Sequence, residues 1–377
     1  MGGDILELKF KEGKFVWIEN GLNYQEVLDE FPKAKIVRVM TFNISKNERS
    51  DQLLDEISKL PEDIDIQFIT NIPSHFDRYY NSPRGDAMRR SFRENCEVYL
   101  RKLNPDNFPP QAMTFFNFSN HAKIVGTENV VYIGSANFSN ESQNNIETGV
   151  IIRDKVFIKS LYNEFFDRIS EQSLTYFDDE YMALRVFVMS MLTKFRVHFM
   201  NFSEEMYWEN PYTNNIEFVR RETWLSENQL NNLNYDLYLL EDLVGNIENA
   251  YEEEDYEYND QMQRILELYN FLDLARLQEL TEADGILYNF IKFDMEAVIN
   301  SCLEEYYAEA YDEYLDHYVE VATDDAREIE ENMLDEVEEV ANEFYTELKK
   351  VLDSLEEIAD IVSCIGEQRI NSQIDNT

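Results

Sequence analysis

A helical repeat near the end of the chain constrains the fold more than any other feature of the sequence. Apolar residues recur there every three or four positions, at Val319, Ala322, Ala326, Ile329, Met333, Val337, Val340, Phe344, Leu348, Val351, Leu355, Ile358 and Val362. Their mean spacing matches the roughly 3.6 residues of one α-helical turn, and the opposite face is mainly Glu and Asp. The pattern predicts one very long helix or two in series, ended by Gly366. Its apolar stripe is expected to pack against another helix, either of the same chain or of a second copy.

Proline and charge divide the 377 residues into two different halves. Seven of the eight prolines and eight of the eleven glycines precede Thr175, and no proline follows Pro211. Residues 1–175 hold 21 Lys and Arg against 26 Asp and Glu, whereas residues 176–377 hold 12 against 50, within a net charge of −43. We therefore expect two domains, 1–175 and 176–377, of which the second is acidic and helical throughout.

The first half alternates between segments of strand and helix character. β-branched and aromatic residues predict strands at 14–19, 35–44, 64–70, 113–119, 122–126, 130–135 and 146–152. Helical spacing predicts helices from 47 to the residue before Pro61, at 84–103 and at 154–169. This order is typical of an α/β layered domain, in which helices flank a mixed sheet. In the second half, helices are also expected at 181–200, 230–243 and 261–280.

Composition narrows the class of protein further. Apolar residues make up 44% of the chain, which is enough to form a core despite the charge. The three cysteines, Cys96, Cys302 and Cys364, are isolated, which is typical of a reducing compartment. The N-terminus has no signal-peptide character, and no apolar run approaches the roughly 20 residues of a membrane span. We expect a cytoplasmic protein with no membrane association.

The stretch NHAKIVGTENVVYIGSANFSN contains the residues best suited to chemistry. His121 lies two residues before Lys123, and Ser135 lies two residues before Asn137, so each pair should share one face of an extended segment. A neutral imidazole can attack phosphorus, while an ammonium, a hydroxyl and an amide can hold the phosphate oxygens. These four residues therefore predict a phosphate site, and the alternative is a surface strand with ordinary polar side chains.

The spacing resembles the motif of the phospholipase D superfamily, in which HxK is followed by four residues, an Asp, six residues and GSxN. His121 and Lys123 match HxK, the run GSAN from Gly134 matches GSxN, and Glu147 matches the acid that often follows on the next strand. This resemblance covers roughly the first 170 residues. Glu128 departs from it, because it stands in place of the Asp and only five residues separate it from Gly134. In that family this acid supports the fold near the site, and the interpretation that we favour for Glu128 is a solvated acid of the hairpin.

The resemblance implies a metal-independent phosphodiesterase that needs no cofactor. It makes His121 the nucleophile, Lys123, Ser135 and Asn137 ligands of the phosphate, and Glu147 the acceptor that fixes a histidine tautomer. The reaction needs a second histidine as general acid, and members with one motif are dimers. The resemblance therefore implies a homodimer in which His121 of each subunit meets its counterpart across the interface.

The other histidines suggest no second site. His75, His198 and His317 form no HxH or HxxxH pair with one another or with His121, and none stands near a cysteine, so we expect no metal site. Each of the three is expected to be a surface residue.

Three features favour nucleic acid as the substrate; they do not distinguish DNA from RNA, and DNA is the expectation. They are the expected location inside the cell, the presence of a single HxK motif in the chain, and the lack of an apolar surface for docking on lipid. Basic residues of the expected helix at 84–103, among them Arg89 and Arg93, predict contacts with a phosphate backbone. The alternative for that helix is a solvated face with acidic neighbours. Two alternatives stand for the whole protein: a phospholipase-type effector that cleaves membrane lipid, and a non-catalytic scaffold of the same fold.

The acidic half needs a separate role. Carboxylates on rigid helices could mask a basic groove by imitating a phosphate backbone, or the helices could serve for dimerisation or for docking a regulatory protein partner. A nuclease joined to such a half suits an anti-phage defence system, by analogy alone.

Overall fold

The computed structural model describes residues 11–19, 21–45, 51–72, 86–139, 142, 144–177, 179–221, 223–250, 258–283, 285–307 and 315–375, with the backbone alone at 86–91, 307 and 367–375. The chain forms two compact units. The N-terminal unit comprises Met1–Ser190 with Glu248–Tyr251, and the C-terminal unit comprises Met191–Ile247 with Glu252–Thr377. The expected functional boundary after Thr175 stays a prediction.

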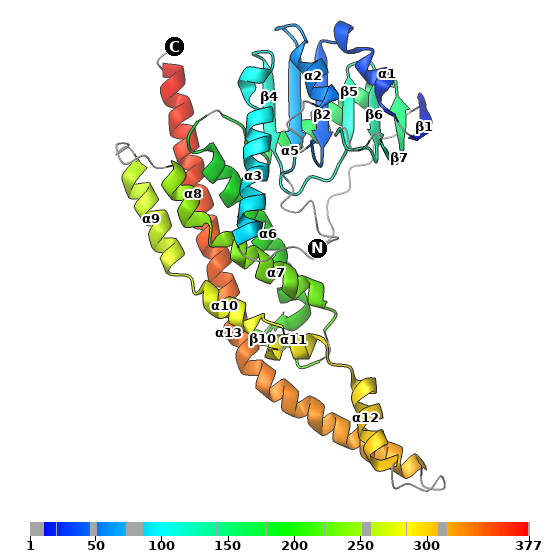
Figure 1. Ribbon diagram of the computed structural model, residues 1–377, viewed down its shortest axis with the longest axis vertical. Coiled ribbons are helices and arrows are strands. Elements are labelled where there is room, and N and C mark those ends of the chain that lie inside the picture. Colours follow the sequence, from blue (N-terminus) through cyan, green and yellow to red (C-terminus); the bar gives the residue numbers. More distant parts are fainter. Residues whose placement is uncertain are drawn as a thin grey trace. The chain divides into compact units, whose positions relative to one another are not determined.

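An eight-stranded mixed sheet forms the centre of the N-terminal unit, in the order β1-β7-β6-β5-β2-β3-β4-β8 (Figure 1). The strands are β1 (Gly13–Glu19), β2 (Ile36–Thr41), β3 (Asp65–Thr70), β4 (Ala112–Phe116), β5 (Ile124–Thr127), β6 (Val131–Gly134), β7 (Ile146–Ile152) and β8 (Leu174–Thr175). Strands β2, β3 and β4 are parallel, and the other pairs are antiparallel. All seven predicted strands are confirmed, whereas β8 is too short for a sequence pattern to show.

One face of the sheet is covered by a helical segment of three parts. These are α4 (Lys155–Ser160), the π-helical turn η4 (Leu161–Phe166) and α5 (Asp167–Glu171). The register pairs Met40 with Ile124 and Ile124 with Ile133, so these side chains share that face. Met40 and Ile124 are buried in one cluster with Phe157 and Leu161 of the covering helices. The predicted helix at 154–169 is thereby confirmed, and Asp154 caps it by accepting the backbone N–H of Val156 and Phe157.

Further helices pack on the N-terminal unit, where Figure 1 shows α1 and α2 lying over the sheet. They are α1 (Gln25–Leu28), α2 (Gln52–Ser58), α3 (Asp86–Lys102) and two short 3₁₀ turns, η1 (Phe31–Lys33) and η2 (Pro105–Asn107). The predicted helices that end at Pro61 and span 84–103 are confirmed as α2 and α3, apart from positions 47–50 and 84–85, which lie outside the described residues. Lys102, which the sequence placed in a basic cluster, is instead buried: it donates to Ser45 O at 2.7 Å and lies 3.6 Å from the Asp51 carboxylate.

The C-terminal unit is mainly helical. Its helices are α6 (Met182–Met206, which begins in the N-terminal unit), α7 (Glu227–Leu240), α8 (Leu243–Ala250), α9 (Asn259–Asn270), α10 (Leu274–Leu280), α11 (Ile286–Ile291), α12 (Met295–Tyr307) and α13 (Leu315–Asp375). The expected helical character of this half is confirmed, and β9 (Tyr207–Glu209) and β10 (Ile216–Phe218) add one short antiparallel hairpin. Pro211 and Asn214, whose φ is 55°, form the connecting turn and interrupt the helical pattern. No described helix is both long and apolar enough to cross a membrane.

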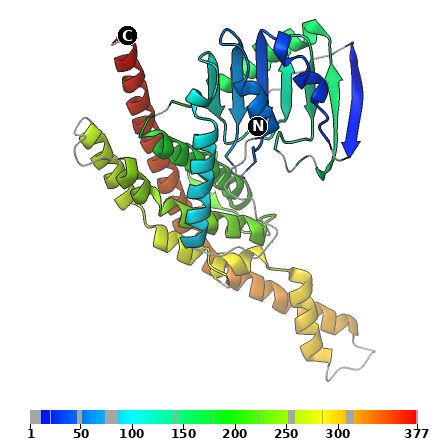
Figure 2. The same ribbon diagram turned by 45° about the horizontal axis from the view of Figure 1, so that its top comes forward.

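Helix α13 confirms the repeat that dominates the sequence. It is a single helix of 61 residues, drawn from orange to red in Figure 2, and it lies beside α12. Helices α9, α10 and α11 also contact it, so its apolar stripe packs against helices of its own chain. The prediction that Gly366 ends the helix was wrong, since the helix continues to Asp375. A glycine inside a helix costs only about 1 kcal/mol, which adjoining turns can offset.

The expectation that His198 is a surface residue was also wrong, whereas His317 is exposed on α13 as expected. The His198 side chain is buried on α6, where its Nε2 lies 2.9 Å from Oδ2 of Asp236 on α7. Lys194, one turn earlier on α6, lies 2.6 Å from the other oxygen of that carboxylate. The three side chains form a buried charge cluster that joins α6 to α7. His75 lies outside the described residues.

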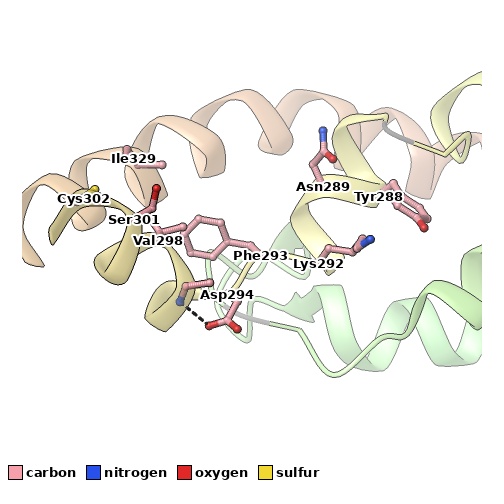
Figure 3. A pocket seen from close by; sticks show the side chains of 10 residues that line it. Tyr288, Asn289, Lys292, Phe293, Asp294, Val298, Ser301, Cys302 and Ile329 are labelled. Atoms are coloured by element: carbon pink, nitrogen blue, oxygen red, sulfur yellow. Dashed lines mark hydrogen bonds between the residues drawn. The ribbon is translucent and has the colours of Figure 1, made fainter. Parts of the chain in front are cut away.

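A shallow hollow of about 530 Å³ lies between the α11–α12 segment and α13 (Figure 3). Three of its polar side chains have partners within the fold. Asp294 accepts the backbone N–H of Ala297 at the start of α12, and Tyr288 and Lys292 both contact Glu227. We therefore regard the hollow as a packing feature of the C-terminal unit.

Candidate active site

The loop between β4 and β5 carries His121 and is tied to the end of β2. The side chain of Asn120 makes two bonds there: its Nδ2 donates to Thr41 O at 2.7 Å, and its Oδ1 accepts the N–H of Ala122 at 2.9 Å. Asn71, just after β3, donates to the carbonyl of Asn120 at 3.3 Å. Asn120 and Asn71 are both buried, so the backbone around His121 is held on either side.

His121 and Lys123 meet, as the motif predicts. They occupy the extended segment before β5, and the Lys123 ammonium lies 3.2 Å from His121 Nδ1 while donating to His121 O at 2.7 Å. Burial, and then repulsion by the Lys123 charge, lower the pKa of His121 below its usual 6.5. Burial also lowers the pKa of Lys123 below 10.5, although the nearby Glu147 carboxylate opposes this shift. The pair thus favours a neutral imidazole beside a cation, which is the state that a phosphorus nucleophile requires.

Phe42 is a third member of this group that the sequence did not reveal. It follows β2, and its ring centroid lies 4.6 Å from that of His121. The Lys123 ammonium lies 5.3 Å from the same ring, within range of a cation–π interaction. A phenylalanine 79 positions before the imidazole gives no signal in the sequence, because only the pairing of β2 with β5 brings the two together.

Ser135 and Glu147 form the neighbouring half of the site at the ends of β6 and β7. The Ser135 hydroxyl donates to the Glu147 carboxylate and accepts the backbone N–H of Thr148 at 3.1 Å. The resemblance makes Glu147 the acceptor of a histidine N–H, but its hydrogen bond in the structure is to Ser135. Asn137 is half-buried, and its Oδ1 is enclosed without a hydrogen-bond partner in the described part of the chain.

A glycine at the start of the GSAN run is required by close packing. The Tyr132 ring lies against Gly134, where a Cβ atom would overlap both the Tyr132 hydroxyl and the carbonyl oxygen of Thr148. The Tyr132 hydroxyl itself donates to that carbonyl at 3.1 Å. Phe138, at the other end of the run, donates its N–H to Thr41 Oγ1 at 3.4 Å. The turn is therefore held against β7 on one side and against the end of β2 on the other.

Glu128 is a structural residue of the hairpin between β5 and β6. Its carboxylate accepts the N–H of Lys35 at 3.1 Å and that of Ile36 at 3.2 Å, at the start of β2. The expectation of a solvated acid was therefore wrong. These donors belong to a strand 92 and 93 residues away, so the sequence around Glu128 could not reveal them.

The predicted phosphate-backbone residues lie on α3. Arg93 is exposed, and the side chain of Arg89 lies outside the described residues, so both roles stay predictions. Among the described residues, no group of three or more His, Cys, Asp and Glu side chains is placed to bind a metal ion.

Comparisons with known proteins show what the N-terminal part of the chain resembles. Residues 30–169 match the model of the family described as "Cardiolipin synthase, PLD-like domain", and no curated protein matches the chain significantly. Three solved structures each match 44% of this chain. Nuc, a phospholipase D family member from Salmonella typhimurium, is 15% identical with a TM-score of 0.29 over 97% of its own chain, and NucT from Helicobacter pylori is 16% identical with a TM-score of 0.29 over 100% of its chain. A phosphatidylserine synthase from Haemophilus influenzae Rd KW20 is 16% identical with a TM-score of 0.32 over 40% of its chain. Likenesses at this level support no statement about activity. The family model covers β2 to β7, the HxK loop and the GSAN turn, so residues 30–169 form a phospholipase D-like domain.

Proposed function

We propose that the protein is a metal-independent nuclease that cleaves DNA through a phospho-histidine at His121. The observation that carries this proposal is the contact between His121 Nδ1 and the Lys123 ammonium, 3.2 Å apart. It sets a cation beside an imidazole whose neutral form is favoured, and Glu147, which accepts the Ser135 hydroxyl, is near enough to Lys123 to affect its pKa. Nothing in the fold of the sheet requires these four polar residues together.

The chemistry follows from the two nitrogens of the ring. Because Nδ1 faces Lys123, attack on phosphorus falls to Nε2, and the P–N bond forms as the bond from phosphorus to the leaving oxygen breaks. A second imidazole, which starts as the imidazolium, gives a proton to that oxygen, and its neutral form then takes a proton from the water that hydrolyses the phospho-histidine. When Lys123 donates to Nδ1, the ring proton stays on Nε2, so this form of the ring cannot attack. The attacking copy needs the other tautomer, in which Lys123 is released to a phosphate oxygen.

The second imidazole is proposed to be His121 of the partner subunit. Each chain carries one HxK segment, and a two-fold axis would bring two identical segments to one phosphate. In the dimer Glu147 would be available to a histidine N–H, in addition to its bond with Ser135. Sedimentation of the wild-type protein at micromolar concentration tests the dimer directly, and a monomer at every concentration with full activity contradicts it.

The test of activity uses the purified full-length chain in EDTA. It is incubated with plasmid, single-stranded DNA, RNA and phospholipid vesicles, and His121→Ala is compared with His317→Ala, which replaces an exposed histidine of α13. We expect cleavage of DNA by the wild type and by His317→Ala, with loss of at least a thousandfold in His121→Ala. Absence of turnover on every substrate would instead support the non-catalytic scaffold.

One observation favours a phospholipid substrate as the second candidate. Phe15, Trp17 and Ile146 are 67%, 63% and 68% exposed, and they share one face of β7 and of β1, which is the edge strand of the sheet. Trp17 pairs with Thr148, whose carbonyl accepts the N–H of Ser135, so the patch is close to the backbone of the site, although strand alternation points its side chains to the face opposite that of Glu147. Vesicle cleavage that falls in Trp17→Ala, while DNA cleavage is absent, would select this candidate.

The acidic helices are proposed to regulate the site, by masking it or by docking a partner, as in a defence system that is activated by infection. The test of masking uses four exposed acidic residues of α13. A variant is made in which glutamine replaces all four, namely Glu328, Glu331, Glu336 and Glu339. The masking proposal predicts faster DNA cleavage by this variant. Unchanged cleavage favours docking of a partner instead.

A further inference from the structure

Asn120 connects the segment that carries His121 to the rest of the site. Its amide nitrogen donates to Thr41 O at 2.7 Å, while its amide oxygen accepts the N–H of Ala122 at 2.9 Å. The second bond closes a local turn around His121, and the first fixes that turn to the end of β2. Asn120 is only 8% exposed, so neither bond competes freely with water.

Thr41 extends this connection to the second half of the motif. Its carbonyl receives Asn120, and its hydroxyl oxygen accepts the N–H of Phe138 at 3.4 Å, immediately after Asn137. One residue of β2 therefore links the HxK segment to the GSAN turn, although Lys123 and Asn137 are 14 positions apart in the sequence. A shift of the Asn120 bond would change the position of the imidazole relative to the GSAN turn.

We propose that Asn120 is a positioning residue, which holds the His121 imidazole against Phe42 and the Lys123 ammonium and in register with the GSAN turn. The inference rests on the proposed phosphodiester chemistry for its effect on rate, and on the hydrogen bonds alone for its effect on the ring. The expected consequence is a change in turnover with little change in substrate binding, because Asn120 is buried behind the segment that it holds.

The same loop contains a matched control. Asn117 is also an asparagine whose Oδ1 accepts the N–H two residues later, that of Ser119, at 3.1 Å. Its Nδ2 donates to Ser173 instead of to the end of β2. Asn117→Ala therefore removes a similar local turn without removing the bond to Thr41. Asn120→Ser is the second variant, since a serine hydroxyl can keep the local turn but is too short to reach Thr41.

The experiment measures kcat and KM on DNA, the melting temperature, and the pKa of His121 from an NMR titration of its ring protons. In Asn120→Ala and Asn120→Ser we expect kcat to fall at least tenfold with KM within twofold. We also expect the pKa of His121 to rise toward 6.5, as the ring leaves its partners. Asn117→Ala should leave both quantities near their wild-type values at a comparable melting temperature.

Two results would overturn the inference. One is an unchanged His121 titration in both Asn120 variants, and the other is a loss of folding in both, which would make the residue purely structural. If the wild type cleaves no substrate, the proposed function fails by itself. The titration then still decides the role of Asn120, because it measures the ring without any turnover.

Discussion

Replacing Asp236 by asparagine removes a buried charge on which two other side chains depend. The Asp236 carboxylate is buried on α7, with Lys194 Nζ at 2.6 Å from one oxygen and His198 Nε2 at 2.9 Å from the other. Burial by itself would raise the pKa of Asp236, but the Lys194 charge and the His198 hydrogen bond outweigh it and lower the pKa from 3.8 to about 2. Since one pKa unit corresponds to about 1.4 kcal/mol, the shift represents about 2 kcal/mol of stability.

The variant should lose more than this amount. Lys194 would keep its charge with a side chain that is only 18% exposed, and a buried pair that loses one partner typically costs about 3–5 kcal/mol. We therefore expect Asp236→Asn to lower the free energy of unfolding by about 3 kcal/mol at pH 7. The matched control is Asp335→Asn, because Asp335 pairs with Arg220 at 2.6 Å on the surface with 70% of its side chain exposed. That variant should cost less than about 1 kcal/mol.

The contribution of Asp236 to the free energy of unfolding should depend on pH. The folded pKa of Asp236 lies below the unfolded value, so its contribution is complete above about pH 4 and is lost as the pH falls toward 2. Urea denaturation followed by circular dichroism at pH 7, 4 and 3 should show the difference between wild type and Asp236→Asn shrinking at the lowest pH. A loss at pH 7 no greater than that of Asp335→Asn, or a difference that stays constant down to pH 3, would refute the reasoning.

Three further predictions concern the N-terminal unit. Because the pKa of His121 is lowered, its neutral form persists below pH 6.5, so the acid limb of kcat/KM should lie below that pH; a limb at or above 6.5 contradicts the assigned environment. Gly134→Ala should destabilise the fold by about 1–3 kcal/mol in urea titrations, since a Cβ would overlap the Tyr132 hydroxyl, whereas Gly285→Ala, with its nearest atom at 3.1 Å, should change it by less than about 1. Glu128→Ala should cost about 1–2 kcal/mol by losing two backbone donors of β2, and Glu128→Gln, which retains one acceptor oxygen, should cost less; equal losses would show that the carboxylate charge matters more than the bonds.

The sheet and the longest helix could be predicted because their signals are local. The alternation of apolar residues at the start of β3, where Ile66 and Phe68 are buried, and the spacing of apolar residues in α13 report which side of each element is buried. The extended segment with His121 and Lys123 was predictable for the same reason, since two residues at a spacing of two must point to the same side. The meeting of these two side chains is confirmed, and their catalytic roles stay predictions.

The residues that hold the site could not be predicted, because their partners are distant in sequence. Asn120 bonds a carbonyl 79 positions earlier, and His198 meets a carboxylate 38 positions later. Partners so far apart leave no pattern in the sequence. In the sequence, a buried polar residue that has hydrogen-bond partners cannot be told from a polar residue that faces solvent. The β9–β10 hairpin was missed for a different reason: three-residue strands are too short to show alternation.

The length of α13 has a consequence for how the C-terminal unit unfolds. Its buried positions run from Ala322 to Ile365, a span of about 65 Å at 1.5 Å per residue, and α9 to α12 all contact it. Four short helices thus pack on the same long helix, and none of them can keep its apolar face buried once α13 unfolds. We expect amides along the middle of α13 to exchange with deuterium at nearly one common rate, since the opening that exposes any of them dismantles the whole scaffold.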